Sequence, residues 1–314
     1  MRLEPIEEAR GLVAGARRIT VLSGAGMSAE SGVPTFRDAQ TGLWARFDPM
    51  QLASEQGFRA DPPLVWRWYA ERRDAVALAE PNAGHTALAT AAGRFDRLCI
   101  VTQNVDGLHR RAGSRDVIEI HGSITQTICL AHCGYVEDQP SRVPNGEPPR
   151  CPNCGDWLRP GVVWFGEMLD PDRLAAAEAA ARDCDVMLVV GTSGLVYPAA
   201  GLPLAARRSG AAVIIVNPAE SELDGLAQVV VRSTAAMALQ RLLGRCRSLV
   251  RRGANPLELL VFQALAGFLA APDDASGQLT HRRHDSPGIH KEPRCVITKS
   301  VSSFIRTRAS RCLR

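Results

Sequence analysis

The feature that most constrains this fold is a series of short apolar runs that alternate with helical stretches. The runs are rich in Val and Ile, which is typical of strands that are buried on both faces of a parallel sheet. They are Ile19–Leu22, Leu98–Thr102, Val117–Ile120, Val186–Val190 and Ala212–Val216. Helical patterns cover 4–17, 171–183 and 199–209. The alternation predicts an α/β fold with a doubly wound parallel sheet.

Two segments interrupt this alternation. Residues 38–95 are rich in Trp, Arg and Ala and are typical of helices with loops, whereas residues 123–160 are rich in Pro, Gly and Cys. We expect both insertions to form a second, smaller domain. The larger, sheet-containing domain then combines three stretches of the chain: 1–37, 96–122 and 161–250.

The pattern fails after about residue 250. An apolar stretch over Leu257–Ala271 is compatible with one helix, and the rest is polar and patternless, which predicts a disordered tail. The tail also holds the basic excess. The whole chain has a formal net charge of +4, but residues 1–250 carry 26 basic and 28 acidic side chains. Net charge therefore gives no argument for a nucleic-acid substrate.

Targeting signals are not evident. No apolar stretch approaches the ~20 residues that cross a bilayer, and the first residues have early acidic side chains and no apolar core, unlike a secretory signal. We therefore expect a cytoplasmic protein without a membrane partner. In that compartment its nine cysteines are thiols or metal ligands before they are disulfides.

A glycine-rich turn follows the first predicted strand. Its sequence runs from Gly24 to Gly32 as GAGMSAESG. Glycines at such a turn let backbone amides approach a pyrophosphate, and a following helix N-terminus adds partial positive charge. The spacing differs from the usual G-x-G-x-x-G, and taken alone a tight strand–helix turn explains it equally well.

The continuation Val33-Pro34-Thr35-Phe36-Arg37 makes the segment resemble the cofactor signature of the sirtuins, which are NAD-dependent protein deacylases. The resemblance extends from about Ile19 to Leu243. Further segments resemble sirtuin motifs in the same order: Thr102–His109, Ile120–Gly122, Val162–Glu167, Gly191–Ser193 and Asn217–Ala219. It implies a Rossmann-like NAD domain with a smaller inserted domain, built from a zinc ribbon and helices.

The resemblance implies a catalytic centre of three residues. His121 would be the base that activates a ribose hydroxyl, and a neutral imidazole near pH 7 suits that task. Asn104 and Asp106 would bind nicotinamide and hold a water or ribose hydroxyl. The implied products are deacylated lysine, nicotinamide and O-acyl-ADP-ribose. From the residues alone, the alternative prediction is structural: His121 is a hydrogen-bonded histidine at the end of a strand, and Asn104 and Asp106 form an Asx turn.

The resemblance also implies the contacts of NAD. Arg37 would pair with phosphate, Phe36 would shield the reacting carbon from water, and Gln103 would contact ribose. The full implied set is Gly24, Ala25, Gly26, Ser28, Ala29, Pro34, Phe36, Arg37, Gln103, Asn104, Val105, Asp106, Gly191, Thr192, Ser193, Asn217, Pro218, Ala219 and Ala235.

A pair of side chains indicates the acyl group. Tyr69 and Arg72 are three positions apart, hence on one face if this segment is helical, where a phenol and a guanidinium could clamp a carboxylate. The pair resembles the Y-x-x-R of class III sirtuins, which prefer succinyl-, malonyl- and glutaryl-lysine, and Gly42-Leu43-Trp44 resembles a loop of that class. Acetyl is kept as a secondary substrate. The bland alternative is an amphipathic helix with an Arg face.

The acylated protein would lie extended along a strand at the substrate cleft, as the resemblance implies. That strand would consist of Val163, Trp164, Phe165, Gly166 and Glu167.

Four cysteines have the spacing of a metal site. Cys129-x3-Cys133 and Cys151-x2-Cys154 enclose a Pro- and Gly-rich loop, which suits one tetrahedral, structural zinc ion. His132 is an alternative ligand to Cys133, and four thiols without metal are the other reading. Four protein ligands leave no open position, which disfavours a catalytic zinc. The remaining cysteines have no partner spacing: Cys99, Cys184, Cys246, Cys295 and Cys312.

Two other functions stay open from the residues. A mono-ADP-ribosyltransferase would share the NAD site but transfer ADP-ribose to an acceptor side chain. A zinc-ribbon nucleic-acid module would use the basic tail, although Phe304 is the only aromatic residue after position 271. Nothing in the sequence indicates an oligomeric state.

Overall fold

The computed structural model describes residues 4–34, 48–138 and 146–244. Several predicted features lie outside these residues: Phe36, Arg37, the Gly42–Trp44 loop, and the helix and tail expected after residue 250. Within the described residues, no helix is long and apolar enough to cross a membrane.

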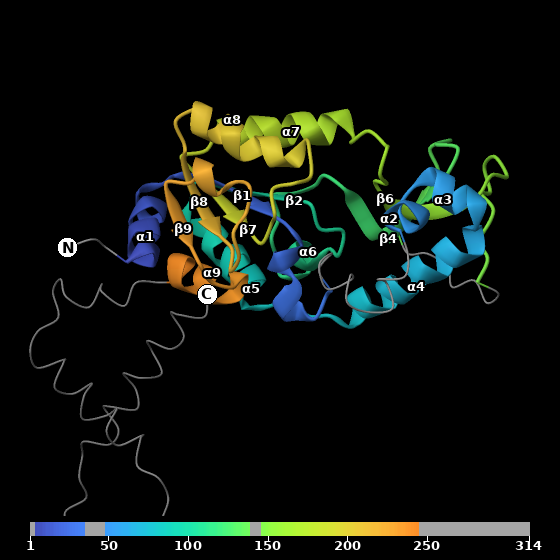
Figure 1. The fold of residues 1–314 in the computed structure, drawn as a ribbon, viewed down its shortest axis with the longest axis horizontal. Helices are drawn as coiled ribbons and strands as arrows, with labels where there is room; N and C mark the ends of the chain where they lie inside the picture. Colours follow the sequence, from blue (N-terminus) through green and yellow to red (C-terminus); the bar gives the residue numbers. More distant parts are fainter. Residues whose placement is uncertain (1–3, 35–47, 139–145, 245–314) are drawn as a thin grey trace, which may run out of the picture. The chain divides into compact units, whose positions relative to one another are not determined.

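A six-stranded parallel sheet forms the centre of the larger part (Figure 1). Its strands are β1 (Arg18–Ser23), β2 (Arg97–Thr102), β3 (Val117–Glu119), β7 (Val186–Val190), β8 (Ala212–Val216) and β9 (Val229–Val231). Their order is β3-β2-β1-β7-β8-β9, so the chain reverses its direction of winding between β1 and β7. This confirms the predicted doubly wound sheet. In such sheets, ligands bind beyond the carboxyl ends of the strands at the reversal point.

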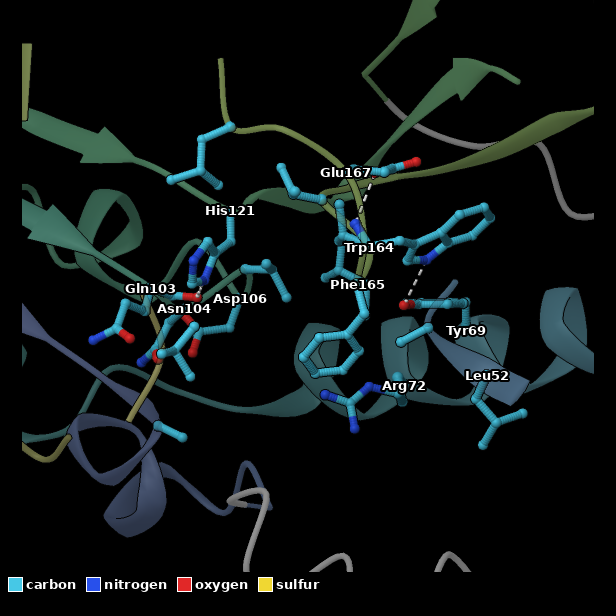
Figure 2. A pocket seen from close by; sticks show the side chains of 18 of the residues that line it. Leu52, Tyr69, Arg72, Gln103, Asn104, Asp106, His121, Trp164, Phe165 and Glu167 are labelled. Atoms are coloured by element: carbon cyan, nitrogen blue, oxygen red, sulfur yellow. Dashed lines mark hydrogen bonds between the residues drawn. The ribbon is translucent and has the colours of Figure 1, made fainter. Parts of the chain in front are cut away.

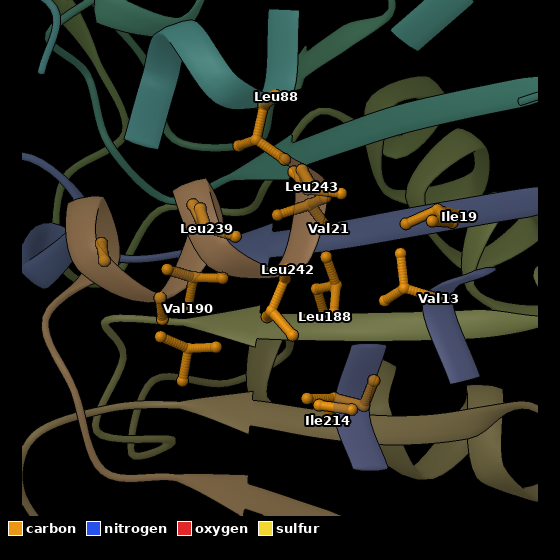
Figure 3. Close-up of a cluster of buried hydrophobic side chains, with 14 of the residues drawn as sticks. Val13, Ile19, Val21, Leu88, Leu188, Val190, Ile214, Leu239, Leu242 and Leu243 are labelled. Carbon is orange, nitrogen blue, oxygen red and sulfur yellow. The ribbon is translucent and has the colours of Figure 1, made fainter. Parts of the chain in front are cut away.

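Helices cover both faces of this sheet, which is why its strands consist mainly of apolar residues. One face packs against α1 (Pro5–Gly15), α5 (Ala83–Ala91) and α9 (Ala235–Leu243), and the other packs against α7 (Pro171–Arg182) and α8 (Leu202–Arg208). Figure 3 shows the first of these cores, where Leu239 and Leu242 of α9 approach Val190 and Leu188 of β7.

Helix starts follow local capping chemistry. The Asp170 side chain accepts hydrogen bonds from the Asp172 and Arg173 amides at 2.9 and 3.2 Å, at the start of α7. At α5, Asn82 and His85 form a reciprocal capping box. Each cap satisfies amides that the first helical turn leaves unpaired. Short helices occupy the connections: α6 (Leu108–Arg111), η1 (Ala25–Met27), η2 (Ala29–Ser31), η5 (Ala92–Arg94), η6 (Ala199–Gly201) and η7 (Asp224–Leu226).

The smaller part combines a three-stranded antiparallel sheet with three helices. The strands, in the order β5-β4-β6, are β4 (Gly122–Cys129), β5 (Val136–Glu137) and β6 (Leu158–Val162). The helices are α2 (Pro49–Leu52), α3 (Glu55–Ala60) and α4 (Pro62–Leu78). They share an apolar cluster that includes Phe58, Val65, Tyr69 and Trp164. Figure 1 shows this part to the right of the large sheet.

The boundaries of the smaller part differ from our expectation in two places. We expected all of 38–95 to belong to it, but Leu88 and Ala91 of α5 are buried in the core of the large sheet. We also expected the larger domain to resume at residue 161. Instead β6 continues to Val162 and Trp164 packs into the apolar cluster of the smaller part. In both places, apolar side chains pack against elements that are distant in the sequence. Local composition does not indicate such contacts.

Candidate active site

Two glycine turns meet at the reversal point of the sheet. The Gly26 amide donates to the Gly191 carbonyl at 2.9 Å. A Cβ atom at Gly26 would lie 2.8 Å from Gly191 Cα, and one at Gly24 would lie 2.8 Å from Gly191 O. Gly191 itself has φ 63°, a left-handed conformation that favours glycine. These glycines are therefore required by the close approach of the turns after β1 and β7, whatever binds there.

A buried polar cluster lies beside the glycine turn. The Ser28 hydroxyl donates to Asp106 Oδ2 at 2.7 Å and accepts from Asn104 Nδ2 at 3.1 Å. Asp106 Oδ1 accepts from the Leu108 amide at 2.9 Å. This is the geometry of an Asx turn, the structural alternative that the sequence left open for Asn104 and Asp106. Asn104 and Asp106 are 8% and 5% exposed, yet both line the cavity described below. The turn therefore presents an amide and a carboxylate to a ligand.

His121 lies just after β3 at the same edge of the sheet. Its Nδ1 lies 3.0 Å from the Gln103 carbonyl oxygen. A carbonyl only accepts, so Nδ1 carries the hydrogen and Nε2 keeps a free lone pair. Burial lowers the pKa of His121 below its ordinary value, although the bond to Gln103 opposes this. The imidazole is therefore neutral near pH 7 and can accept a proton at Nε2.

One cavity of about 1010 Å³ joins the sheet edge to the smaller part (Figure 2). Ser28, Asn104, Asp106 and His121 line one wall. The opposite wall comes from α4 and from the turn after β6, with apolar side chains between. The predicted catalytic residues and the predicted acyl-binding residues therefore share a single space.

Thr192 lies outside the lining of this cavity but is bonded to two other predicted cofactor residues. The Thr192 hydroxyl accepts from Gln103 Nε2 at 3.1 Å, and its carbonyl accepts from Asn217 Nδ2 at 3.1 Å. These bonds tie together the turns after β2, β7 and β8. Ser193 is partly buried, Pro218, Ala219 and Ala29 are exposed, and Pro34 and Val105 line the cavity. Ala235 is buried at the first position of α9.

Arg72 and Arg73 are adjacent on α4 and have opposite surroundings. Arg73 donates to the carbonyl oxygens of Ile124 and Gln126 at 2.7 and 3.1 Å, and to Thr127 Oγ1 at 3.2 Å. Arg72 lines the cavity and has its guanidinium 4.7 Å from the centre of the Trp68 ring. Within the described ranges, no hydrogen-bond acceptor pairs with Arg72, and burial lowers its pKa below the ordinary value.

Tyr69 lies one helical turn before Arg72. Its side chain is 4% exposed, and its hydroxyl oxygen accepts from Trp164 Nε1 at 3.0 Å. Burial raises the pKa of Tyr69 to about 12, so the phenol stays protonated at neutral pH. Figure 2 shows the Tyr69 ring beside Trp164, with Arg72 directed toward the cavity.

The segment Val163–Glu167 follows the end of β6 and is not a strand, so our expectation of a strand there is wrong; that the segment binds the acylated protein stays a prediction. The Glu167 side chain turns back on its own segment. Its Oε2 accepts from the Trp164 amide at 2.7 Å and from the buried Arg159 at 3.0 Å. The Val163 amide donates to the His121 carbonyl at 2.9 Å, and Gly166 has φ 87°. Within this segment, Phe165 is the one large apolar residue that is exposed at the cavity, to 47%.

The four predicted metal ligands come together. The sulfur atoms of Cys129, Cys133, Cys151 and Cys154 all lie within 4.8 Å of one another. This fits a structural zinc, whose tetrahedral site takes four thiolates. His132 is not part of the cluster. Its φ of 53° lets the C-x3-C segment accommodate one more residue than the usual C-x2-C while still directing Cys133 to the other ligands.

Some residues at the cavity were not predicted. Trp68 stacks on Arg72, and the i, i+4 spacing of the two on a helix is a sequence signal that could have shown this. Met168 and Tyr197 also line the cavity although they are 92% and 75% exposed. They lie in two loops that are distant in sequence, so no local pattern indicates that they meet.

Comparison with known proteins shows the family of the chain. Residues 24–198 match the model of the Sir2 family. An "NAD-dependent protein deacylase" of Ralstonia nicotianae is 54% identical over 236 residues, which cover 75% of this chain and 95% of the relative.

Solved structures agree. A Sir2 homologue in complex with NAD is 44% identical with a TM-score of 0.70, and the match covers 76% of this chain and 92% of that one. A complex titled "Sir2-p53 peptide-NAD+" is 31% identical with a TM-score of 0.65, and the match covers 77% and 97%.

Proposed function

This chain belongs to the Sir2 family and is an NAD-dependent protein deacylase, and from that premise we propose that it preferentially removes acidic acyl groups from lysine side chains. Succinyl and malonyl are the preferred groups and acetyl is a secondary one. The substrates are acylated proteins or peptides. The products are deacylated lysine, nicotinamide and O-acyl-ADP-ribose.

The observation that carries the acidic preference is the guanidinium of Arg72, which has no hydrogen-bond acceptor among the residues that the structure describes. A cation in a largely apolar cavity is costly unless a partner compensates its lost hydration. Arg73, one position away, obtains that compensation from three oxygen atoms of the protein. From the described part of the chain, Arg72 obtains a stacking contact with Trp68 and no such oxygen partner. A carboxylate at the end of a succinyl or malonyl group would supply the missing partner, whereas an acetyl group would not.

Bound NAD supplies the ribose that accepts the acyl group as nicotinamide departs. In our proposal, His121 accepts a proton from a ribose hydroxyl at Nε2, because Nδ1 is occupied by the Gln103 carbonyl. Asn104 and Asp106 hold the nicotinamide amide or a ribose hydroxyl, oriented by their shared contact with Ser28. Phe165 reduces access of water to the cavity.

The residues implied for NAD fit that group. The Gly24–Gly26 turn lies after β1 at the reversal point of the sheet, and the Ser28 cluster offers both donors and an acceptor at the cavity wall. Thr192 and Asn217 lie at the ends of β7 and β8, where a doubly wound sheet binds dinucleotides. We propose that they, with Ser193, Pro218, Ala219 and Ala235, contact the adenosine half.

An acyl panel tests this function. The purified chain is incubated with NAD and one peptide that carries succinyl-, malonyl-, glutaryl- or acetyl-lysine, and peptide mass and nicotinamide release are followed. We expect NAD-dependent loss of the acyl mass, with a higher kcat/KM for the acidic groups. A gain of the mass of ADP-ribose on the peptide would indicate the transferase instead. Equal kcat/KM for all acyl groups would refute the acidic preference.

A further inference from the structure

The hydrogen bond between Trp164 and Tyr69 has a fixed direction. An indole N–H can only donate, whereas a phenol oxygen can accept and its hydrogen can donate. Trp164 therefore occupies a lone pair of the Tyr69 oxygen, at 3.0 Å, and the phenol hydrogen must point elsewhere. Among the residues that the structure describes, no acceptor is recorded for that hydrogen.

The indole has little freedom to move. Trp164 is 2% exposed, its ring lies 5.3 Å from that of Phe58, and the Arg159 guanidinium lies 3.6 Å from its centre. Its backbone amide is bound by Glu167, which Arg159 holds in turn. Packing against Phe58 and Arg159 and a hydrogen-bonded backbone amide fix the point from which the N–H approaches Tyr69.

The other side of Tyr69 faces the charged end of the cavity. Tyr69 and Arg72 occupy one face of α4, and both line the cavity. With one lone pair taken by the indole, the phenol hydrogen is free to be donated on the side of Arg72. The phenol also stays protonated, because burial raises the pKa of Tyr69 to about 12.

We propose that Trp164 is a positioning residue for acyl selectivity: its indole N–H orients the Tyr69 hydroxyl so that Tyr69 and Arg72 donate together to the terminal carboxylate of the acyl group. This replaces the direct peptide contact that the sequence suggested for Trp164. The inference rests on the proposed acidic-acyl function. It adds that selectivity depends on a buried residue 95 positions away from Tyr69.

The test is Trp164→Phe, which removes the donor and retains an aromatic ring for Phe58 and Arg159. We expect kcat/KM for the succinyl peptide to fall about tenfold, mainly through KM, as for loss of one hydrogen bond to a charged group. The acetyl peptide should lose less than about threefold. Trp66→Phe is the matched control, because Trp66 is 3% exposed in the same part but has no recorded bond to Tyr69. Trp66→Phe should change kcat/KM equally for the succinyl and acetyl peptides.

A double-mutant cycle separates positioning from packing. In a Tyr69→Phe background, Trp164→Phe should no longer alter the succinyl-to-acetyl ratio, because the hydroxyl it orients is gone. Two results would overturn the inference. One is that Trp164→Phe lowers kcat/KM equally for the succinyl and acetyl peptides. The other is that Trp164→Phe lowers the succinyl-to-acetyl ratio of kcat/KM as much in the Tyr69→Phe background as in the wild type.

Two further measurements keep the outcome decisive. If Trp164→Phe does not fold, the indole N–H signals of the ¹⁵N-tryptophan-labelled wild type are followed instead. One of them should shift with succinyl peptide but not with acetyl peptide, and not in Tyr69→Phe; no such difference contradicts the inference. If the wild type shows no acidic preference, the proposed function fails. A preference that needs Arg72 but survives Trp164→Phe refutes the inference alone.

Discussion

The two walls of the cavity are built in opposite ways. On the sheet wall, Ser28, Asn104, Asp106 and His121 bond to one another or to backbone groups, so their geometry exists before any ligand arrives. On the α4 wall, a guanidinium lines the cavity without an acceptor among the described residues. Preorganised groups suit a reaction that is common to all acyl substrates, whereas an unpaired charge suits discrimination between them.

The neighbouring arginines of α4 repeat this contrast at short range. Arg73 is used by the fold, because it ties α4 to β4. In our proposal, Arg72 is available to bind the acyl group of the substrate. The same residue type at consecutive positions therefore has two different tasks, and the difference arises from which acceptors the zinc-ribbon sheet brings to each side of the helix.

Removing zinc should give the largest effect on stability, and it should unfold the smaller part, which carries the α4 wall, while the large sheet stays folded. Structural zinc contributes its binding energy to folding, so Cys151→Ala should cost more than about 5 kcal/mol in the smaller part. Hydrogen exchange should show β4, β6 and α4 losing protection while β1 and β7 keep theirs, and zinc content should fall from one ion per chain to none. Cys184→Ala, outside the cluster, should retain the metal. Unchanged protection in the zinc-free chain would contradict this expectation.

The next largest effect should be the loss of catalysis when His121 on the sheet wall is replaced. His121→Ala removes the only cavity-lining imidazole of the described residues, and we expect kcat to fall about 1000-fold for succinyl and acetyl peptides alike. Circular dichroism and NAD binding should remain near those of the wild type. Turnover that survives in the folded variant would remove His121 from the mechanism.

Arg73→Met should affect stability rather than selectivity. The change leaves the Ile124 and Gln126 carbonyls without their donor, which should lower the free energy of unfolding by about 3 kcal/mol. Denaturant unfolding measures the loss. The succinyl-to-acetyl ratio of kcat/KM should stay within about twofold of the wild type; a collapse of that ratio would erase the distinction between the two arginines.

The smallest effect is the pH dependence. Burial lowers the pKa of His121, so its neutral form persists below the ordinary histidine value of about 6.5. Activity should stay level down to that pH and fall only below it, by up to about tenfold per unit once the folded-state pKa is passed. Both peptides should follow the same profile, because Arg72 does not titrate in this range. Separate midpoints for the two would place a titrating group on the α4 wall.

The sequence predicted the sheet better than the second domain. Strands β7 and β8 have the predicted bounds, because a strand buried on both faces is an uninterrupted apolar run. Strand β9, at Val229–Val231, was missed. Strand β4 was missed because polar Thr and Gln residues interrupt its pattern. Both depend on pairing with neighbours, which local composition does not show.

For the candidate site, the sequence indicated which residues take part but not the hydrogen bonds between them. The resemblance implied a strand over Val163–Glu167, yet the Glu167 side chain bonds back to the Trp164 amide and to Arg159, eight positions before it. The bond from Trp164 to Tyr69 joins two elements that meet only in the tertiary structure. Resemblance could indicate which side chains matter there, but the contact that orients them required the fold.

The central claim is that an unpaired Arg72 selects the acyl group, and the most direct measurement compares Arg72→Met with Arg73→Met. The quantity is the ratio of kcat/KM for succinyl- and acetyl-lysine peptides of one sequence. A charged hydrogen bond lost only from the succinyl complex predicts that Arg72→Met lowers the ratio by about 10- to 100-fold while Arg73→Met leaves it unchanged. Equal losses on both peptides in Arg72→Met would contradict the account.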